Sequence, residues 1–236
     1  MGRIRRYYSA LSRYHKSKGY GIHSPFAFSF VLNVLRERLP YYTYDDLNIL
    51  RHFVIDQTRQ HFTHPAVISF KSAKLVFRVA NYFNPPEILQ FGTSYGVSSA
   101  SVLAVSSKSH LVLCEPKLMQ YPVTEHVLEP IRNRISVYDD AASAIAAYKR
   151  GKSVPFILIN AINNGDLPAI SKYLHSIFKS GEAVVIIRNI SRSDTIKSLW
   201  LDCKASIPSG MTFSNEKLAV ITSNEKLPRQ DFFLWF

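Results

Sequence analysis

From residue 87 onward, short apolar runs alternate with amphipathic segments, and this rhythm constrains the fold more than any other feature of the chain. The apolar runs are Glu87–Phe91, Leu111–Cys114, Ile135–Tyr138, Phe156–Ile159 and Glu182–Ile187. The segments that follow them have helical spacing, and they are Val97–Ser106, Met119–Glu129, Ala141–Lys149, Leu167–Phe178 and Asp194–Cys203. Strands that alternate with helices of this length form βαβ units, so the pattern predicts a parallel sheet with helices on both faces.

The rhythm changes after the last of these helices. Two apolar runs, Met211–Phe213 and Leu218–Thr222, are separated only by a short polar turn at 214–216, so they predict a β-hairpin. The expected fold class is α/β, a three-layer Rossmann-like fold whose mostly parallel sheet is closed by a C-terminal antiparallel hairpin. In such a sheet, ligands bind beyond the carboxyl ends of the strands.

The first quarter of the chain has a different sequence pattern, because its apolar residues have helical spacing and it is rich in aromatic residues. We expect a basic, aromatic helical N-terminal extension over residues 1–64 and an α/β domain over residues 65–236. One helix begins with Ser24 as N-cap and Pro25 at the first helical position, and Pro40 closes it. The other helices expected before the sheet lie around Ile4–Leu11, Leu47–Arg59 and Ser69–Phe83.

Positive charge gathers at the N-terminus. The chain carries 29 Lys and Arg against 17 Asp and Glu, a formal charge of +12, and residues 1–20 hold six of the basic residues and no acid. Tyrosines are interleaved with these charges, so the segment can follow an RNA backbone while its rings stack on bases. The alternatives are a solvated helix whose tyrosines pack on the domain, and an Arg-rich transit peptide.

No segment of the chain fits a membrane span or a secretory signal. The longest apolar run, Ala183–Ile187, is far shorter than the ~20 residues of a transmembrane helix, and the N-terminus lacks the apolar core of a signal peptide. Cys114 and Cys203 share no disulfide or metal-ligand spacing, so both are expected to be reduced. These features predict a cytoplasmic protein without a membrane partner, and they leave the oligomeric state open.

The turn after the first predicted strand has the residue types of a ligand loop. Gly92 allows a sharp turn and a close approach of a ligand, and Gly96 allows the next helix to start against the strand. Glu115 follows Gly92 by 23 residues, at the end of the second strand, which is the spacing of acids that bind ribose hydroxyls. After the third strand, Asp139-Asp140 can reach an adenine amino group, or Asp140 can cap the next helix.

Residues 88–98, ILQFGTSYGVS, resemble the ILELGTSLGIS first motif of S-adenosylmethionine (SAM)-dependent methyltransferases, in the branch similar to catechol O-methyltransferases. Residues 21–26, GIHSPF, resemble the start of a group of bacterial methyltransferase-like proteins with a basic leading helix. The resemblance implies the class I methyltransferase fold, in which the Gly92–Gly96 loop holds the methionine end of SAM and Glu115 holds its ribose. The cofactor-binding residues expected on this basis are Phe91, Gly92, Thr93, Ser94, Tyr95, Gly96, Ser98, Glu115, Asp139 and Asp140.

The sequence departs from this family at positions that carry charge. Gln90 stands where the family has an acid, which removes a negative charge near the cofactor's ammonium group. Relatives that use Mg²⁺ hold it with carboxylates after the fourth and fifth strands, where this chain has Asn160 and Arg188-Asn189. A divalent cation does not tolerate a guanidinium among its ligands, so no metal is expected. Asn160 and Arg188 remain as catalytic candidates, and Arg188 either balances an acidic substrate or phosphate or forms an ordinary salt bridge.

Three functions remain open at this point. The first is a metal-independent SAM-dependent methyltransferase with an unidentified small or macromolecular acceptor, because methyl transfer needs little beyond in-line positioning. The second is a catalytically degenerate interaction module that binds the cofactor weakly or not at all. The third is association with nucleic acid through residues 1–20. A dehydrogenase is disfavoured, because the loop reads G-x-x-x-G rather than the G-x-G-x-x-G of nicotinamide sites.

Overall fold

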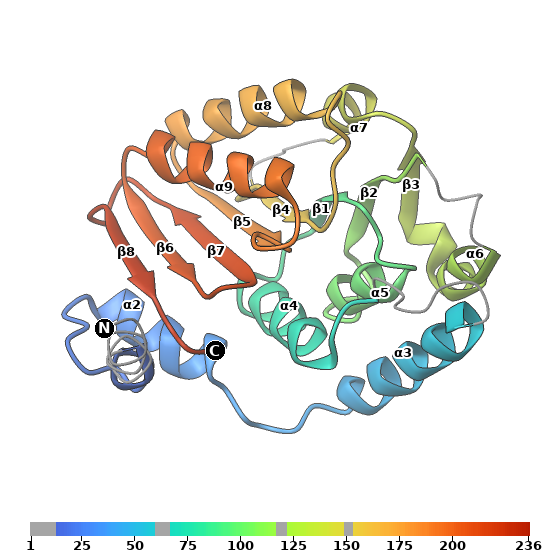
Figure 1. The fold of residues 1–236 in the computed structure, drawn as a ribbon, viewed down its shortest axis with the longest axis horizontal. Coiled ribbons are helices and arrows are strands. Elements are labelled where there is room, and N and C mark those ends of the chain that lie inside the picture. The colour runs from blue at the N-terminus through green and yellow to red at the C-terminus, as the bar shows by residue number, and fades with distance from the viewer. Residues whose placement is uncertain (1–12, 60–66, 117–121, 149–152) are drawn as a thin grey trace, which may run out of the picture.

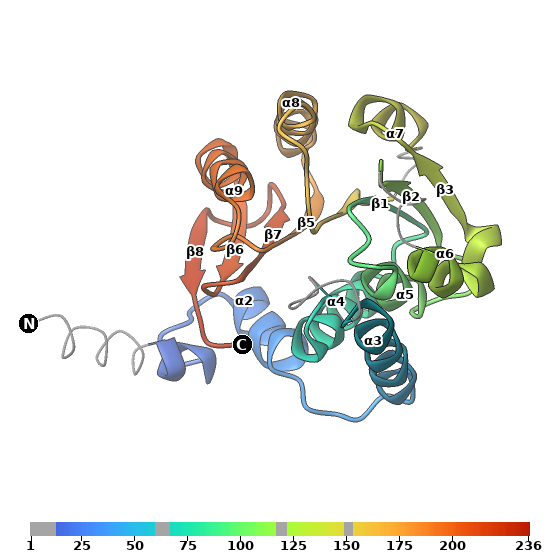
Figure 2. The same ribbon diagram turned by 45° about the vertical axis from the view of Figure 1, so that its right-hand side comes forward.

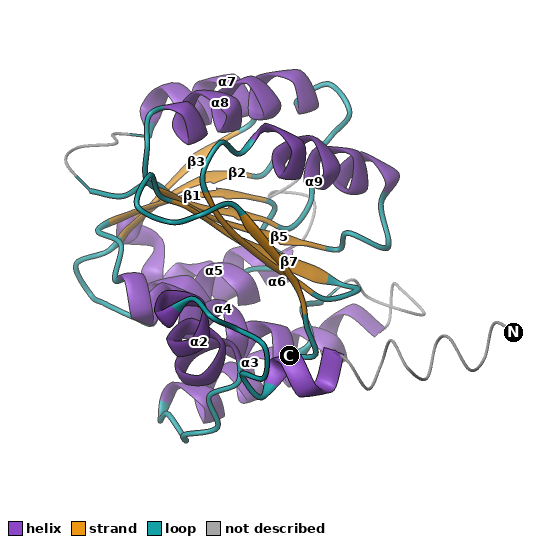
Figure 3. Ribbon diagram, turned by 90° about the vertical axis from the view of Figure 1, so that its left-hand side faces the viewer, coloured by secondary structure: helices purple, strands orange, loops and turns teal. Residues whose placement is uncertain are grey.

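The computed structural model describes residues 13–59, 67–116, 122–148 and 153–236. These residues form three layers, with a twisted sheet between two groups of helices (Figures 1 and 3). The helix expected around Ile4–Leu11 lies outside the described residues. The α/β class and the Rossmann-like layering predicted from the alternating runs are confirmed.

The described strands form one eight-stranded sheet with the order β3-β2-β1-β4-β5-β7-β6-β8. β1 to β5 pair in parallel, and β7 runs antiparallel to both of its neighbours, β5 and β6. The strands are β1 (Glu87–Phe91), β2 (His110–Cys114), β3 (Ile135–Tyr138), β4 (Phe156–Ile159), β5 (Ala183–Arg188), β6 (Gly210–Ser214), β7 (Leu218–Ser223) and β8 (Gln230–Phe233). The predicted closing hairpin is therefore present as β6 and β7.

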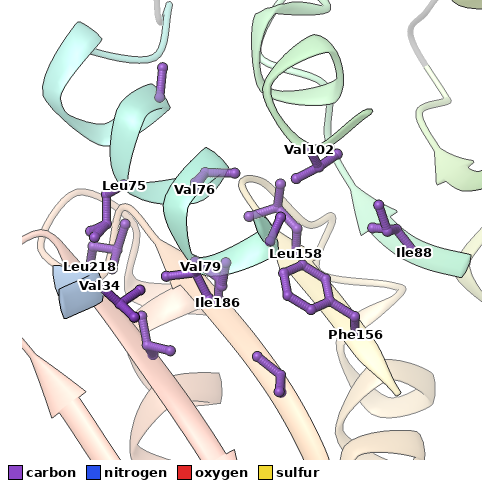
Figure 4. Close-up of a cluster of buried hydrophobic side chains, with 14 of the residues drawn as sticks. Val34, Leu75, Val76, Val79, Ile88, Val102, Phe156, Leu158, Ile186 and Leu218 are labelled. Atoms are coloured by element: carbon purple, nitrogen blue, oxygen red, sulfur yellow. The ribbon is translucent and has the colours of Figure 1, made fainter. Parts of the chain in front are cut away.

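Both faces of the central strands are buried, and alternate residues enter opposite cores because side chains alternate along a strand. In β1, Ile88 joins the core on the α4 side of the sheet and Leu89 joins the core on the α8 side. Figure 4 shows Ile88, Phe156 and Leu158 pointing toward Val76 and Val102 in the first of these cores. This two-sided burial explains why the strands read as continuous apolar runs.

Helices cover both faces of the sheet. α7, α8 and α9 lie on one side, and α4, α5 and α6 lie on the other (Figure 2). Side chains cap several of them, since Ser69 accepts a hydrogen bond from the Ser72 amide and Ser193 accepts one from the Ile196 amide. The helices are α4 (Phe70–Phe83), α5 (Val97–Leu103), α6 (Pro122–Leu128), α7 (Ala141–Ala147), α8 (Leu167–Lys179) and α9 (Asp194–Ser206).

The helix predicted to run from Pro25 to Pro40 is wrong in its length. Ser24 caps it as expected, but α2 (Pro25–Phe30) continues as a π-helix only over Val31–Leu35. The Arg78 guanidinium donates hydrogen bonds to the Val34 and Leu35 carbonyls, at 2.6 and 2.9 Å. A side chain from α4 therefore satisfies carbonyls that a longer helix would have bonded itself.

Several other elements differ from their predicted bounds by one to four residues, and one strand was not predicted at all. α3 (Thr43–Arg59) begins four residues before the predicted Leu47. β8 was not predicted, because its four residues, two polar followed by two aromatic, have no alternation of apolar and polar types, although their burial alternates in the structure. β8 pairs in parallel with β6 and extends the sheet at its end.

The N-terminal region contributes to the same hydrophobic core as the sheet. Phe30 is fully buried, with its ring centroid 4.9 Å from that of Phe213 in β6, and burial of such a side chain stabilises a fold by about 1.5–3 kcal/mol. Residues 13–17 are helical, and the Ser17 hydroxyl accepts a hydrogen bond from the Trp235 amide at 2.6 Å. The described part of the basic segment at residues 1–20 thus packs on the C-terminal end of the chain. Among the described residues, no helix is long and apolar enough to span a membrane.

Candidate functional site

The candidate site lies at the carboxyl ends of the central parallel strands. The chain leaves β1 toward β2 on one side, and β4 pairs with β1 on the other side, so the strand order reverses direction between β1 and β4. Ligands of open α/β sheets bind at such a switch point. The loops after β1, β2, β4 and β5 therefore converge on the place that the sequence predicted.

The loop after β1 has a backbone that glycine makes possible. Gly92, Ser94, Tyr95 and Gly96 all have positive φ angles, of 78°, 53°, 58° and 87°. A Cβ on Gly92 would lie 2.9 Å from the Ala161 backbone nitrogen, which belongs to the next loop of the sheet. A Cβ on Gly96 would lie 2.5 Å from a methyl carbon of Val127. Both glycines are thus required by close packing, in addition to their conformation.

Two buried amide side chains, those of Gln90 and Asn160, form hydrogen bonds to this loop. Gln90 donates through Nε2 to the Gly92 carbonyl at 2.7 Å and contacts the hydroxyls of Ser98 and Ser99 at 2.9 Å. Asn160 donates through Nδ2 to the same carbonyl at 2.6 Å and to the Ser98 hydroxyl at 3.0 Å. The Ser98 hydroxyl in turn donates to the Thr93 carbonyl.

The amide of Gln90 has a physical role at the position where the similar first motif has an acid. The Gly92 carbonyl needs donors, which an ionised carboxylate cannot supply. The Oε1 atom of Gln90 is buried and has no hydrogen-bond partner among the described residues. Gln90 therefore serves the internal structure of the loop through its nitrogen.

Glu115 follows β2 and is tied to the same loop. One of its carboxylate oxygens accepts a hydrogen bond from the Thr93 amide at 2.8 Å. A carboxylate has about four acceptor positions, so the half-buried group keeps capacity for hydroxyls of a ligand. Glu115 and Gly92 line a cavity of about 220 Å³, together with residues that the sequence did not single out: Cys114, Pro116, Ala161, Ile162, Asn163, Asp166 and Ile170.

The missed lining residues come mainly from the loop after β4. The sequence was compared with the family pattern after β4 only for metal-binding and catalytic residues, so 161–166 was not predicted to line a cavity. The signal that could have found this loop is its place, because β4 is the strand next to β1 at the switch point.

Asp139 and Asp140 lie after β3 and are exposed. Asp140 is the N-cap of α7, because its carboxylate accepts a hydrogen bond from the Ser143 amide at 2.8 Å. This bond holds the pKa of Asp140 below its usual value. The capping interpretation of Asp140 is thus confirmed, and a contact of either residue with adenine stays a prediction.

A second cavity, of about 310 Å³, lies beside the first and shares Ala161 and Ile162 with it. Asn160, at the end of β4, and Arg188, at the end of β5, both line this second cavity. The Arg188 guanidinium donates to Oδ1 of Asn160 at 2.5 Å, and burial lowers the pKa of Arg188 to about 10. One amide side chain therefore joins the wall of the second cavity to the loop of the first.

The residues at these strand ends do not fit a divalent metal ion. Asn160, Arg188 and Asn189 offer no carboxylate, and the guanidinium repels a cation. Within the described parts of the chain, no group of three or more His, Cys, Asp or Glu side chains is arranged to hold a metal.

Cys114 lines the first cavity, yet burial raises the pKa of its thiol to about 12. The thiol is therefore protonated near neutral pH, and the thiolate is the form that acts as a nucleophile. We assign Cys114 no covalent role. Cys203 is likewise buried, with a raised pKa.

No family model matches the sequence, and no curated protein matches it. Solved structures do share the fold. The O-methyltransferase from Bacillus cereus in complex with S-adenosylhomocysteine (SAH) has a TM-score of 0.56 and 16% identity, over 82% of this chain and 96% of that one. TomG, an O-methyltransferase from Streptomyces achromogenes involved in tomaymycin synthesis and solved with SAM, has a TM-score of 0.54 and 14% identity, over 84% and 96%.

A methyltransferase from Geobacter sulfurreducens gives a similar result, with a TM-score of 0.54 and 13% identity over 84% of this chain and 96% of that one. At these identities the similarity establishes the fold alone. It shows that the chain of this protein spans nearly the whole length of each of these structures. Which chemistry the site performs has to be argued from its own residues.

Proposed function

We propose that the protein is a SAM-dependent methyltransferase that needs no metal ion. The observation that carries this proposal is the pair of cavities at the carboxyl edge of the sheet, which share the wall formed by Ala161 and Ile162. A methyl transferase needs two ligands side by side, one that carries the methyl group and one that receives it. The bound SAM and SAH of the structures with the same fold support the first cavity as the cofactor site.

Each part of the first cavity has a role in this proposal. The Gly92–Gly96 loop brings the main chain close to the methionine end of SAM, and Glu115 accepts hydrogen bonds from the ribose hydroxyls. When bound, SAM would supply a methyl group on a sulfonium: the acceptor's lone pair would form the new bond as the S–C bond breaks, SAH would be released, and a proton carried by the acceptor atom would pass to solvent. The remaining task of the protein is to align the two ligands, which contributes most of the rate in such transfers.

The first test is calorimetry with SAH on the wild-type protein and on Glu115→Ala. Removal of a hydrogen-bonded carboxylate costs about 1.5–3 kcal/mol, so the variant should bind SAH at least about tenfold more weakly. Glu225→Ala is the matched control, because Glu225 is exposed on a loop away from both cavities. Equal SAH binding by the wild type and Glu115→Ala would contradict the assignment of the cofactor site.

A second candidate function is an interaction module without catalysis. It is favoured by the size of the first cavity, because 220 Å³ lies below the ~300–1,000 Å³ of typical ligand pockets. It also agrees with the use of Gln90 inside the loop. A wild-type protein that binds neither SAM nor SAH would favour this function over the enzyme.

A further inference from the structure

The second cavity carries an excess of positive charge. Arg188, Arg192 and Lys217 line it, and no acidic side chain is among its described lining residues. Arg192 and Lys217 are exposed and lie on the loop after β5 and on the turn before β7. Cations from separate segments thus meet around one small space.

Arg188 is the unusual member of this set. It is only 6% exposed, and no carboxylate lies within ion-pair distance of it among the described residues. Its hydrogen-bond partner is the neutral amide of Asn160. A buried charge is normally paired, because its removal from water is costly. The salt bridge that the sequence analysis left open for Arg188 is therefore not found in the described structure.

Neutral groups of the cavity complement these cations. Ser69, the N-cap of α4, and Ser193, the N-cap of α9, both line the cavity. The N-termini of two helices of 14 and 13 residues therefore border the same space. Helix N-termini carry partial positive charge and hydrogen-bond donors, so they add to the attraction of the three cations for an anion.

We propose that the second cavity binds a small acceptor molecule through an anionic oxygen group, a carboxylate or a phosphate, with Arg188 as its principal counter-charge. This proposal rests on the proposed function, since it names the acceptor class of that site. A volume of about 310 Å³ suits a small molecule. In this arrangement the guanidinium orients the acceptor at the place where relatives with carboxylates would hold a metal ion.

The asymmetry of the chain's charge supports a small anion over a general attraction for polyanions. Arg188 is buried at the end of β5, where the backbone of a polymer cannot reach it. The segment with the densest positive charge is the leader at residues 1–20, and its described residues Arg13 and Ser17 contact Glu216 and Trp235 at the C-terminal end. The buried cation thus favours a compact ligand that enters the cavity.

The test measures anion binding by the full-length protein at constant ionic strength, with pyrophosphate and malonate as probes. The double variant Arg192→Gln, Lys217→Gln removes two exposed charges of the cavity without disturbing the core. The matched control is Lys108→Gln, Lys226→Gln, which removes the same charge from exposed positions elsewhere. SAH binding is measured on every protein in parallel.

We expect the wild type to bind pyrophosphate, malonate or both, and the probe that binds distinguishes phosphate from carboxylate recognition. The cavity variant should bind that probe at least about tenfold more weakly and keep its affinity for SAH, whereas the control should keep both. Arg188→Gln, with its fold checked by circular dichroism, should abolish binding of the probe.

Three results would overturn the proposal: no binding of either probe by the wild type, an equal loss in the cavity and control variants, or tighter binding of a single-stranded RNA that displaces the probe. The proposed function fails separately. If the wild type binds the anion but not SAH, the anion cavity stands and the proposed methyltransferase function is wrong. If it binds SAH but no anion, only the proposed class of acceptor is wrong.

Discussion

The two halves of the sheet's carboxyl edge differ in what forms them. On the β1–β2 side, the loop from Gly92 to Gly96 is shaped by its positive φ angles and by neighbours so close to Gly92 and Gly96 that they leave no room for a Cβ. On the β4–β5 side, the character of the cavity comes from side chains at strand ends, above all Asn160 and Arg188. The first half is therefore hard to change without loss of structure. The second half depends on the identity of two buried side chains, which Asn160 and Arg188 supply.

Asn160 connects these two halves. Its Nδ2 donates to the Gly92 carbonyl of the first, and its Oδ1 accepts from the Arg188 guanidinium of the second. An amide can do both, because it carries a donor and an acceptor. A carboxylate at this position could satisfy the guanidinium but would leave the carbonyl without this donor. The side chain of position 160 and the charge of position 188 are thus matched to each other.

The largest effect should come from breaking the first half. Gly96→Ala places a Cβ 2.5 Å from Val127 at a φ of 87°, so we expect unfolding to become easier by about 1–3 kcal/mol and SAH binding to be lost. Thermal unfolding and calorimetry measure the two effects. The matched control is Gly165→Ala, since a Cβ on Gly165 meets nothing within 4 Å. Equal behaviour of the two variants would remove the steric account of the loop.

An intermediate effect should follow when the link between the halves is removed. Asn160→Ala takes a donor from the buried Gly92 carbonyl and an acceptor from the Arg188 guanidinium, and loss of such bonds costs about 1–3 kcal/mol. We expect weaker binding of both SAH and pyrophosphate, measured by calorimetry. Asn133→Ala, at an exposed position, should change neither. A variant of Asn160 that weakens only one ligand would show that the halves are independent.

The smallest effect is expected from metal removal, which tests the second half alone. Methyl transfer to an anionic acceptor, followed as SAH produced, should keep its rate in EDTA, because Asn160, Arg188 and Asn189 present no carboxylate to a cation. A rate that falls in EDTA and returns with Mg²⁺ would contradict the role given to Arg188. A monovalent salt added to the same ionic strength is the control for screening of the acceptor's charge by the EDTA solution.

Much of the fold could be read from the sequence, because its signals are local. β1, β3 and β4 have the predicted ends, and β4 shows the reason most clearly, since burial of all its residues makes it a continuous apolar run. The sequence also located the glycines of the β1 loop and Glu115 at the end of β2, because each residue type has a local reason to stand there, and their contact with a cofactor stays a prediction. The early end of the helix at Leu35 was missed, because Arg78 bonds its last carbonyls from more than 40 residues along the chain, and β8 was missed because its own residues give no strand pattern.

What the sequence by itself determined is the alternation of strands and helices, the glycines of the β1 loop and the placement of Asn160 and Arg188 at the ends of two strands. Only the tertiary structure decided that Gln90 and Asn160 share one carbonyl, that the 161–162 segment separates two cavities, and that Arg188 is buried without a described carboxylate. The physical reason is the distance along the chain over which each kind of interaction acts. Periodicity and residue type act over a few neighbouring positions, whereas partners in a hydrogen-bond network or a cavity wall meet only after distant strands have packed side by side.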